Sequence, residues 1–184
     1  MKDYNINGLS LLNELGTTHF NIPVLLGEYK LMDWGGHEGF ERIKLNKLIK
    51  GSSTKKGSFV YIYILNKSQV VYIGQTVITS RIFTPSSIGG FNKQTGDVLI
   101  PSNKHGKRNV STFFQVFDLL KQGNTLEVYL IEAKENNKIV TEFGDELEVI
   151  IKPQNMEKLL QDKYKAIHNT LPMMHELHEQ AYNY

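Results

Sequence analysis

The sequence of 184 residues contains no cysteine, few prolines and a single tryptophan. Without cysteine there can be no disulfide scaffold, thiolate zinc site or cysteine nucleophile. A large excess of charge is also lacking, because 21 basic residues nearly balance 19 acidic ones, which excludes a histone-like basic tail. No apolar run approaches the roughly 20 residues of a membrane span, and the N-terminus lacks the basic-then-apolar pattern of an export signal. We therefore expect a cytoplasmic protein with no membrane partner.

Length and composition predict one globular domain with a small appendage. Hydrophobic residues make up 40% and charged residues 22% of the chain, as in ordinary globular proteins. The polar stretch 51–58 is rich in Gly and Ser and indicates a boundary. We therefore assign residues 1–57 to an N-terminal extension and 58–184 to the main domain. Within the extension, residues 9–16 and 40–49 have apolar spacing typical of short helices.

The strongest local pattern is a pair of strands at residues 59–65 and 69–73, both rich in aromatic and β-branched residues. The turn between them decides which side chains share a face of the hairpin. If residues 66–67 form a two-residue turn, Tyr61 lies opposite Tyr72 on the same face. A three-residue turn without a bulge would place these two tyrosines on opposite faces.

The rest of the chain predicts an α/β (α+β) fold, with a small, mainly antiparallel central sheet flanked by helices and preceded by the helical extension. Residues 84–110 form a long irregular stretch rich in Gly and Pro. One helix is expected after Ser111, and another from Asn155, which would place Glu157 in its first turn. Further strands are expected at residues 126–132 and 146–152.

The hairpin and the sequence after it resemble the GIY-YIG nuclease superfamily. Tyr61 matches the tyrosine of the first half-motif, residues 72–74 (YIG) form an intact second half, and Arg81 matches the arginine that opens the family's first helix. Glu157 and Asn169 match the metal-binding glutamate of a later helix and the asparagine that follows it. The branch it resembles includes phage endonuclease II and type II restriction endonucleases of this superfamily.

This resemblance implies a Mg²⁺-dependent endonuclease that hydrolyses phosphodiester bonds in double-stranded DNA, of the type II restriction class, in which Mn²⁺ can replace Mg²⁺. Glu157 would hold the metal, which prefers oxygen ligands. The planar guanidinium of Arg81 would contact phosphate oxygens. Tyr61 would act as general base and Tyr72 would orient the attacking water. Asn169 would orient Glu157 or contact the DNA backbone.

Other residues of the chain are auxiliary candidates under the same resemblance. Pro85 stands where many members have a histidine, and Tyr63, His105 or Lys107 could replace that histidine. The extension would recognise DNA or mediate dimerisation, and cleavage of two strands implies a homodimer or homotetramer. A basic run in the irregular stretch is expected to contact DNA phosphates, through Lys104, Lys107 and Arg108.

Two alternatives to a restriction enzyme stay open. One is a low-specificity or structure-specific nuclease of a phage or repair system, which the motifs do not separate from the first reading. The other is a non-catalytic DNA-binding protein on a decayed nuclease scaffold, since Phe59 or Val60 stands in place of the first half-motif glycine. We expect no zinc site in the tail, because His175 and His178 lack the HExxH order.

Overall fold

The computed structural model describes residues 23–35, 38–48, 56–79, 82, 90–95, 98–99, 107–132, 137–140, 146–149 and 153–175. Four of the predictions lie outside these residues: the helix at 9–16, Arg81, Lys104 and His105. In the described ranges, no helix is both long enough and apolar enough to cross a membrane.

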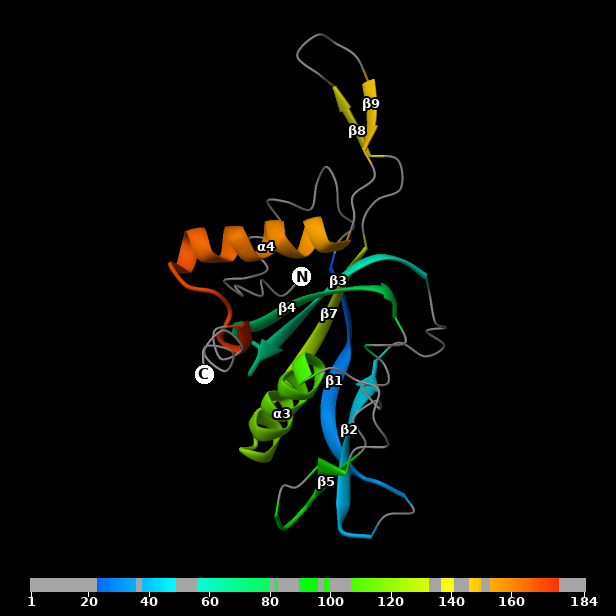
Figure 1. Cartoon of the computed structure of the whole chain (residues 1–184), viewed down its shortest axis with the longest axis vertical. Helices are drawn as coiled ribbons and strands as arrows, with labels where there is room; N and C mark the ends of the chain where they lie inside the picture. The colour runs from blue at the N-terminus through cyan, green and yellow to red at the C-terminus, as the bar shows by residue number, and fades with distance from the viewer. Residues whose placement is uncertain are drawn as a thin grey trace.

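A seven-stranded antiparallel sheet forms the centre of the described part of the chain, as the sequence predicts, in the order β4-β3-β7-β1-β2-β5-β6. A separate hairpin connects β7 to the last helix and projects away from the sheet (Figure 1). The strands are β1 (Val24–Asp33), β2 (Phe40–Lys47), β3 (Lys56–Leu65), β4 (Gln69–Ile78), β5 (Gly90–Asn92), β6 (Val98–Leu99) and β7 (Leu126–Glu132), with β8 (Asn137–Val140) and β9 (Glu146–Val149) in the hairpin.

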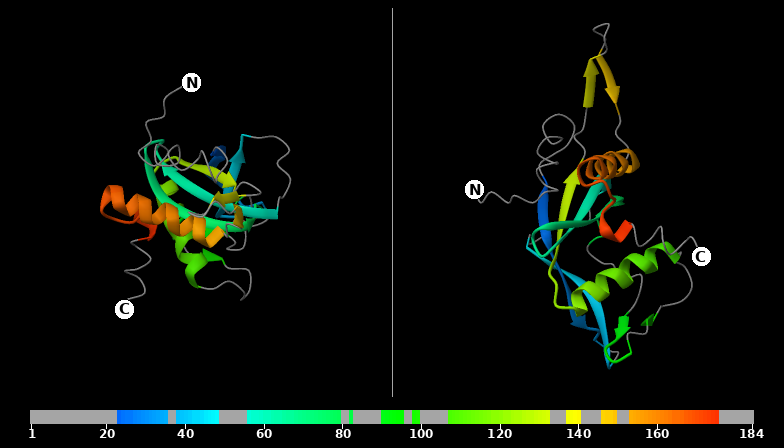
Figure 2. Two further views of the ribbon diagram at one scale, coloured as in Figure 1. Left: turned by 90° about the horizontal axis from the view of Figure 1, so that it is seen from above. Right: turned by 90° about the vertical axis from the view of Figure 1, so that its left-hand side faces the viewer.

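Two helices pack on opposite faces of the sheet. Helix α3 (Lys107–Lys121) contributes Val116 and Phe117 to a buried cluster on one face. Helix α4 (Pro153–His168) contributes Met156 and Leu160 to a second cluster on the other face. Figure 2 shows the C-terminal turn, residues 173–175, between the two helices. The sheet is therefore covered on both sides at β3 and β4.

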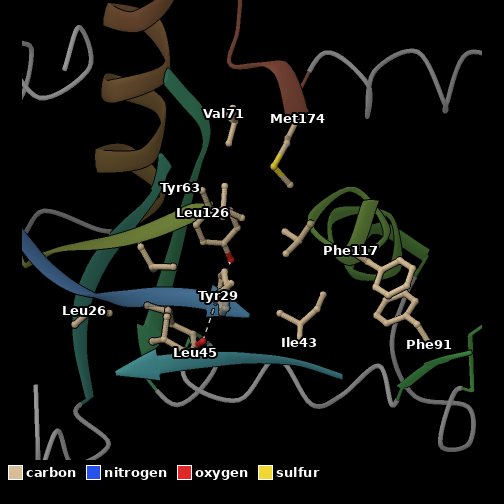
Figure 3. Packing of buried hydrophobic residues seen from close by; sticks show 13 residues of the cluster. Leu26, Tyr29, Ile43, Leu45, Tyr63, Val71, Phe91, Phe117, Leu126 and Met174 are labelled. Carbon is tan, nitrogen blue, oxygen red and sulfur yellow. Dashed lines mark hydrogen bonds between the residues drawn. The ribbon is translucent and has the colours of Figure 1, made fainter. Parts of the chain in front are cut away.

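Strand β3 is hydrophobic along its length because both of its faces are buried. Val60, Ile62 and Ile64 point toward α4, whereas Tyr63 points toward α3. Figure 3 shows Tyr63 close to Tyr29 of β1 in the middle of the α3-side cluster. Strand β3, which the sequence predicts most clearly, thus contributes side chains to the buried clusters on both faces of the sheet.

The helix predicted over residues 40–49 is wrong, because residues 40–47 form strand β2. In β2 the alternating residues Ile43 and Leu45 are buried in the α3-side cluster, whereas Leu48 is exposed. β2 pairs with β1, which in turn pairs with β7. Residues 24–47 therefore share the sheet of the main domain, and their part in DNA recognition or dimerisation stays a prediction.

The predicted register of the β3–β4 hairpin is also wrong. The prediction that Tyr61 and Tyr72 share one face of the hairpin is nevertheless correct. Residues 66–68 form a three-residue turn, and Tyr63, not Tyr61, lies opposite Tyr72. The register shifts by one residue in β4 at Val71, which forms a bulge. This extra residue cancels the effect of the longer turn, so all three tyrosines still lie on one face.

Two adjacent leucines of α4 provide a test of this packing. Leu160 is 1% exposed within the α4-side cluster, whereas Leu159 is 41% exposed. We expect Leu160→Ala to lower the free energy of unfolding by about 2–5 kcal/mol, because it leaves a cavity. Leu159→Ala should cost much less. Urea unfolding followed by circular dichroism measures both, and equal losses would contradict the placement of α4.

Candidate active site

Three phenol rings lie together on the α3 side of the β3–β4 hairpin. The ring centroids of Tyr61 and Tyr72 are 5.9 Å apart, those of Tyr63 and Tyr72 are 5.2 Å apart, and those of Tyr61 and Tyr63 are 5.4 Å apart. All three pairs are tilted by 31–38°, within the range of favourable aromatic contacts. The sequence-predicted pair Tyr61 and Tyr72 is therefore brought together, with Tyr63 as a third member.

Gly74 lies directly beneath two of these rings. It pairs with Tyr61 across the hairpin, and a Cβ atom at this position would lie 2.6 Å from Cζ of Tyr61 and 2.5 Å from Cε1 of Tyr72. Real Cβ atoms do not approach neighbours so closely. The glycine of the YIG sequence is thus required sterically, because the phenols lie against its backbone.

Glu157 reaches the same region from α4. Its Oε1 atom accepts a hydrogen bond of 3.1 Å from Nε2 of Gln161, one turn later on the helix. The Gln161 amide also donates to the backbone carbonyl of Ile73, at 3.3 Å, which fixes the helix against the edge of β4. The negative charge of Glu157 acts on the phenol of Tyr61. A carboxylate carried by the helix on one face of the sheet thus acts electrostatically on a phenol of the other face.

Glu157 does not lie in the first turn of its helix, contrary to the prediction. The helix begins at Pro153, two residues before Asn155, which makes Glu157 its fifth residue. Because the favourable effect of the helix dipole on an anion falls off within the first turn, it contributes less here than expected. The hydrogen bond from Gln161 helps to orient this carboxylate.

His175, from the C-terminal turn, packs against strand β4 beside Tyr72. Its imidazole stacks on the ring of Tyr72, with centroids 4.6 Å apart and an angle of 7° between the planes. Its Nε2 atom lies 2.8 Å from the carbonyl oxygen and 3.2 Å from the amide nitrogen of Ile73. The histidine therefore contacts a site tyrosine and the backbone of the edge strand at once.

The buried hydroxyl groups of Tyr29 and Tyr63 connect the phenol cluster to Ile82, which follows β4 in the sequence. Tyr29 donates a hydrogen bond of 3.0 Å to the carbonyl oxygen of Ile82, and its oxygen lies 3.3 Å from that of Tyr63. Because the single proton of Tyr29 goes to the carbonyl, Tyr63 is the donor between the two hydroxyls. Tyr29 thus anchors the residue that follows Arg81 in sequence.

The pKa values of three phenols are raised above their usual value of about 10. For Tyr61 the causes are burial, the neighbouring phenols Tyr63 and Tyr72, and the charge of Glu157. Burial is also the main cause for Tyr63 and for Tyr29, although the hydrogen bond from Tyr63 partly offsets it at Tyr29. These surroundings favour the neutral phenol, so Tyr61 can act as a base only beside added positive charge.

The structure does not bring every predicted residue to this cluster. Asn169 follows the last turn of α4, twelve residues beyond Glu157, which is about 18 Å along a helix axis. Its positive φ of 56° and the hydrogen bond from its backbone N–H to Lys165 make it a helix C-cap. It therefore cannot orient Glu157, and its contact with DNA stays a prediction. Lys107 and Arg108 begin α3, but their side chains lie outside the description.

Sequence reasoning missed Gln161, His175 and Tyr29 as members of this region. Gln161 carries a detectable signal, because it lies four residues after Glu157 and such residues are neighbours on a helix. His175 and Tyr29 come from segments far away in sequence, and only the packing of the C-terminal turn and of β1 brings them here.

A divalent cation would find one carboxylate here, that of Glu157. In the described part of the chain, no three acidic, histidine or cysteine side chains gather as a metal cluster. The donor set nevertheless fits Mg²⁺, which is commonly held by one or two carboxylates together with substrate phosphates and water. Gln161 supplies the supporting hydrogen bond that such a ligand needs.

Comparison with solved structures finds similar chains. The chain is similar to a mutant of bacteriophage T4 EndoII, with 16% identical residues and a TM-score of 0.41 over 88% of this chain and 94% of that one. No protein-family model and no curated protein sequence matches the chain. A likeness this weak assigns neither a fold nor an activity, so a functional inference has to rest on the site itself.

Substituting Gly74 tests the close packing of the phenols. We expect Gly74→Ala to displace Tyr61 and Tyr72, because the added Cβ overlaps both rings. Their aromatic resonances in a nuclear magnetic resonance spectrum should shift. Gly35→Ala is the matched control, because nothing lies within 4 Å of a Cβ there. Unchanged tyrosine resonances in Gly74→Ala would contradict the arrangement.

The raised pKa values predict how the tyrosines titrate. The chain has nine tyrosines, and the unfolded protein should ionise them near pH 10. The folded protein should keep the protons of Tyr29, Tyr61 and Tyr63 to higher pH. The free energy of unfolding should therefore fall as the pH rises above about 10, because the unfolded state then loses protons that the native state retains. Tyrosinate absorbance follows the titration, and ionisation of all nine together near pH 10 in the folded protein would contradict it.

Proposed function

We propose that the protein is a Mg²⁺-dependent DNA endonuclease that hydrolyses phosphodiester bonds in double-stranded DNA. The observation that carries the proposal is the packing of Tyr61 and Tyr72 over Gly74, with the charge of Glu157 acting on the Tyr61 phenol. Two hydroxyl groups and a carboxylate at a strand edge can bind a water, a phosphate and a hard cation together. The EndoII likeness agrees with this proposal but adds no weight to it.

Each of five residues has a role in the proposed reaction. When bound, Mg²⁺ would neutralise phosphate charge and lower the pKa of a coordinated water. Glu157 would hold the ion, and Gln161 donates a hydrogen bond that orients its carboxylate. Tyr72 orients the attacking water and Tyr61 accepts its proton. Because the pKa of Tyr61 is raised in the free protein, this role requires a cation beside it, and we assign it to Arg81.

We further propose that the protein acts in the cytoplasm as a type II restriction enzyme. Two strands are cut most simply by a homodimer or homotetramer on DNA. A low-specificity phage or repair nuclease would use the same side chains and differ in its products, a smear rather than discrete fragments. A non-catalytic DNA-binding protein would bind plasmid without cutting it in the presence of Mg²⁺ or Mn²⁺.

The acidic residue provides the decisive test of the proposed function. Glu157→Gln keeps the shape of the side chain and one oxygen that can accept from Gln161, but removes the charge and one acceptor oxygen. We expect it to lower plasmid cleavage in Mg²⁺ about a hundredfold or more while leaving DNA binding intact, because the lost interaction stabilises the transition state. Cleavage is measured on gels, with EDTA as the metal-free reference, and binding by mobility shift in EDTA.

The matched control is Asp162→Asn, the same exchange at an exposed position of the same helix. It should cleave like the wild type. If both variants cut DNA at the wild-type rate, Glu157 does not belong to the active site. If the wild type cuts no DNA with either metal, the chain is not a nuclease.

A further inference from the structure

We propose that His175 is a positioning residue of this site, which holds the Tyr72 ring and the edge of β4 in the arrangement that the reaction requires. The inference rests on the proposed function, since it concerns the same site. It adds a residue from the C-terminal turn to a set otherwise contributed by the β3–β4 hairpin and α4.

The imidazole is matched to Tyr72 in both orientation and distance. The two rings are almost parallel, at 7°, and their centroids are 4.6 Å apart. Tyr72 also contacts the other phenols, Tyr61 and Tyr63. His175 therefore packs on a ring that belongs to the tyrosine cluster. Removing the imidazole would leave the ring free to tilt away from Gly74.

The same imidazole closes the edge strand at the second residue of the YIG sequence. Among the described strands β4 pairs only with β3, and Nε2 of His175 lies within hydrogen-bonding distance of the N–H and C=O of Ile73. The shorter distance, 2.8 Å, is to the carbonyl oxygen. Open backbone groups at a sheet edge would otherwise pair with water or another chain. His175 thus fixes the backbone between Tyr72 and Gly74.

Gln161 connects this contact to the acidic residue. Its amide nitrogen lies 3.3 Å from the carbonyl oxygen of Ile73, 3.1 Å from Oε1 of Glu157 and 3.4 Å from Nε2 of His175. Because the amide has two protons, it can donate to both oxygens. Nε2 of His175 accepts from the N–H of Ile73 when it carries no proton and donates to the carbonyl of Ile73 when it does. A shift of His175 would therefore change the surroundings of Tyr72 and Glu157 together.

The backbone that carries His175 is itself held firmly. Met174 is fully buried in the α3-side cluster, where Figure 3 shows it pointing inward from the C-terminal turn. The N–H of His175 donates to the carbonyl of Pro172 at 2.8 Å. The position of the imidazole is thus determined by the core rather than by chance contact of a chain end.

Two substitutions of His175 separate its ring from its nitrogen. His175→Phe retains a stacking ring but loses Nε2, whereas His175→Gln places an amide near the position of Nε2 and loses the ring. We expect His175→Phe to lower turnover at saturating DNA about ten- to a hundredfold with DNA affinity unchanged, as for other residues that orient a metal ligand. His175→Gln should retain more activity, because it can still bond to Ile73.

The matched control is His168, which contacts another tyrosine at the far end of α4. Its ring lies 4.3 Å from that of Tyr164 and tilts by 35°. His168→Phe should leave turnover unchanged. The inference is overturned if His175→Phe turns over like the wild type, or if His168→Phe loses as much. If His175→Phe does not fold, wild-type turnover in a variant that removes both ring and nitrogen, His175→Ser, overturns it as well.

A spectroscopic measurement separates this inference from the proposed function. In the protein without DNA, the ring resonances of Tyr72 should shift in His175→Gln, which loses the stacked ring, and should stay in place in His168→Gln. No shift would overturn the positioning role even if the wild type cuts DNA. If the resonances shift but the wild type cuts no DNA with either metal, His175 still positions Tyr72 and it is the nuclease function that fails.

Discussion

The contact between the backbone of Gly74 and the rings of Tyr61 and Tyr72 determines how the rest of the site is arranged. With no Cβ beneath them, the phenols lie close to the strand instead of standing away from it. Tyr72 then presents one side to His175, and Tyr61 comes within electrostatic reach of Glu157. The hairpin can hold its two phenols in this close arrangement only because this one position carries no side chain.

Elements with a strong local pattern could be predicted from the sequence. The hydrophobic β3 and β4, the alternation of β7, and helices α3 and α4 are all present. β1 and β2 could not be predicted, because charged residues interrupt them and their apolar residues also fit a helix. What decides their structure is pairing between strands, with β1 lying between β2 and β7. Such long-range pairing leaves little trace in a local window.

The candidate site likewise contains residues that the sequence predicts and residues that it does not. The sequence predicted Tyr61 and Tyr72, whose rings the structure brings together, and Glu157, whose charge acts on Tyr61. It also grouped Asn169 with Glu157, although most of a helix separates them. The predicted register of the hairpin was wrong, but the bulge in β4 restored the predicted face of the tyrosines. Neither the longer turn nor the bulge can be seen in the pattern of apolar residues. His175 was out of reach, because its role depends on how the chain end folds back over a distant strand.

The β8–β9 hairpin has a consequence for how this chain can change in length. It lies in the connection between β7 and α4, pairs only with itself among the described strands, and projects away from the sheet (Figure 1). The elements on either side are held independently by the α4-side cluster, through Ile131 and Met156. Loop closure costs little more for a longer connection. The β8–β9 hairpin can therefore be lengthened, shortened or replaced, in evolution or by protein engineering, without moving Glu157.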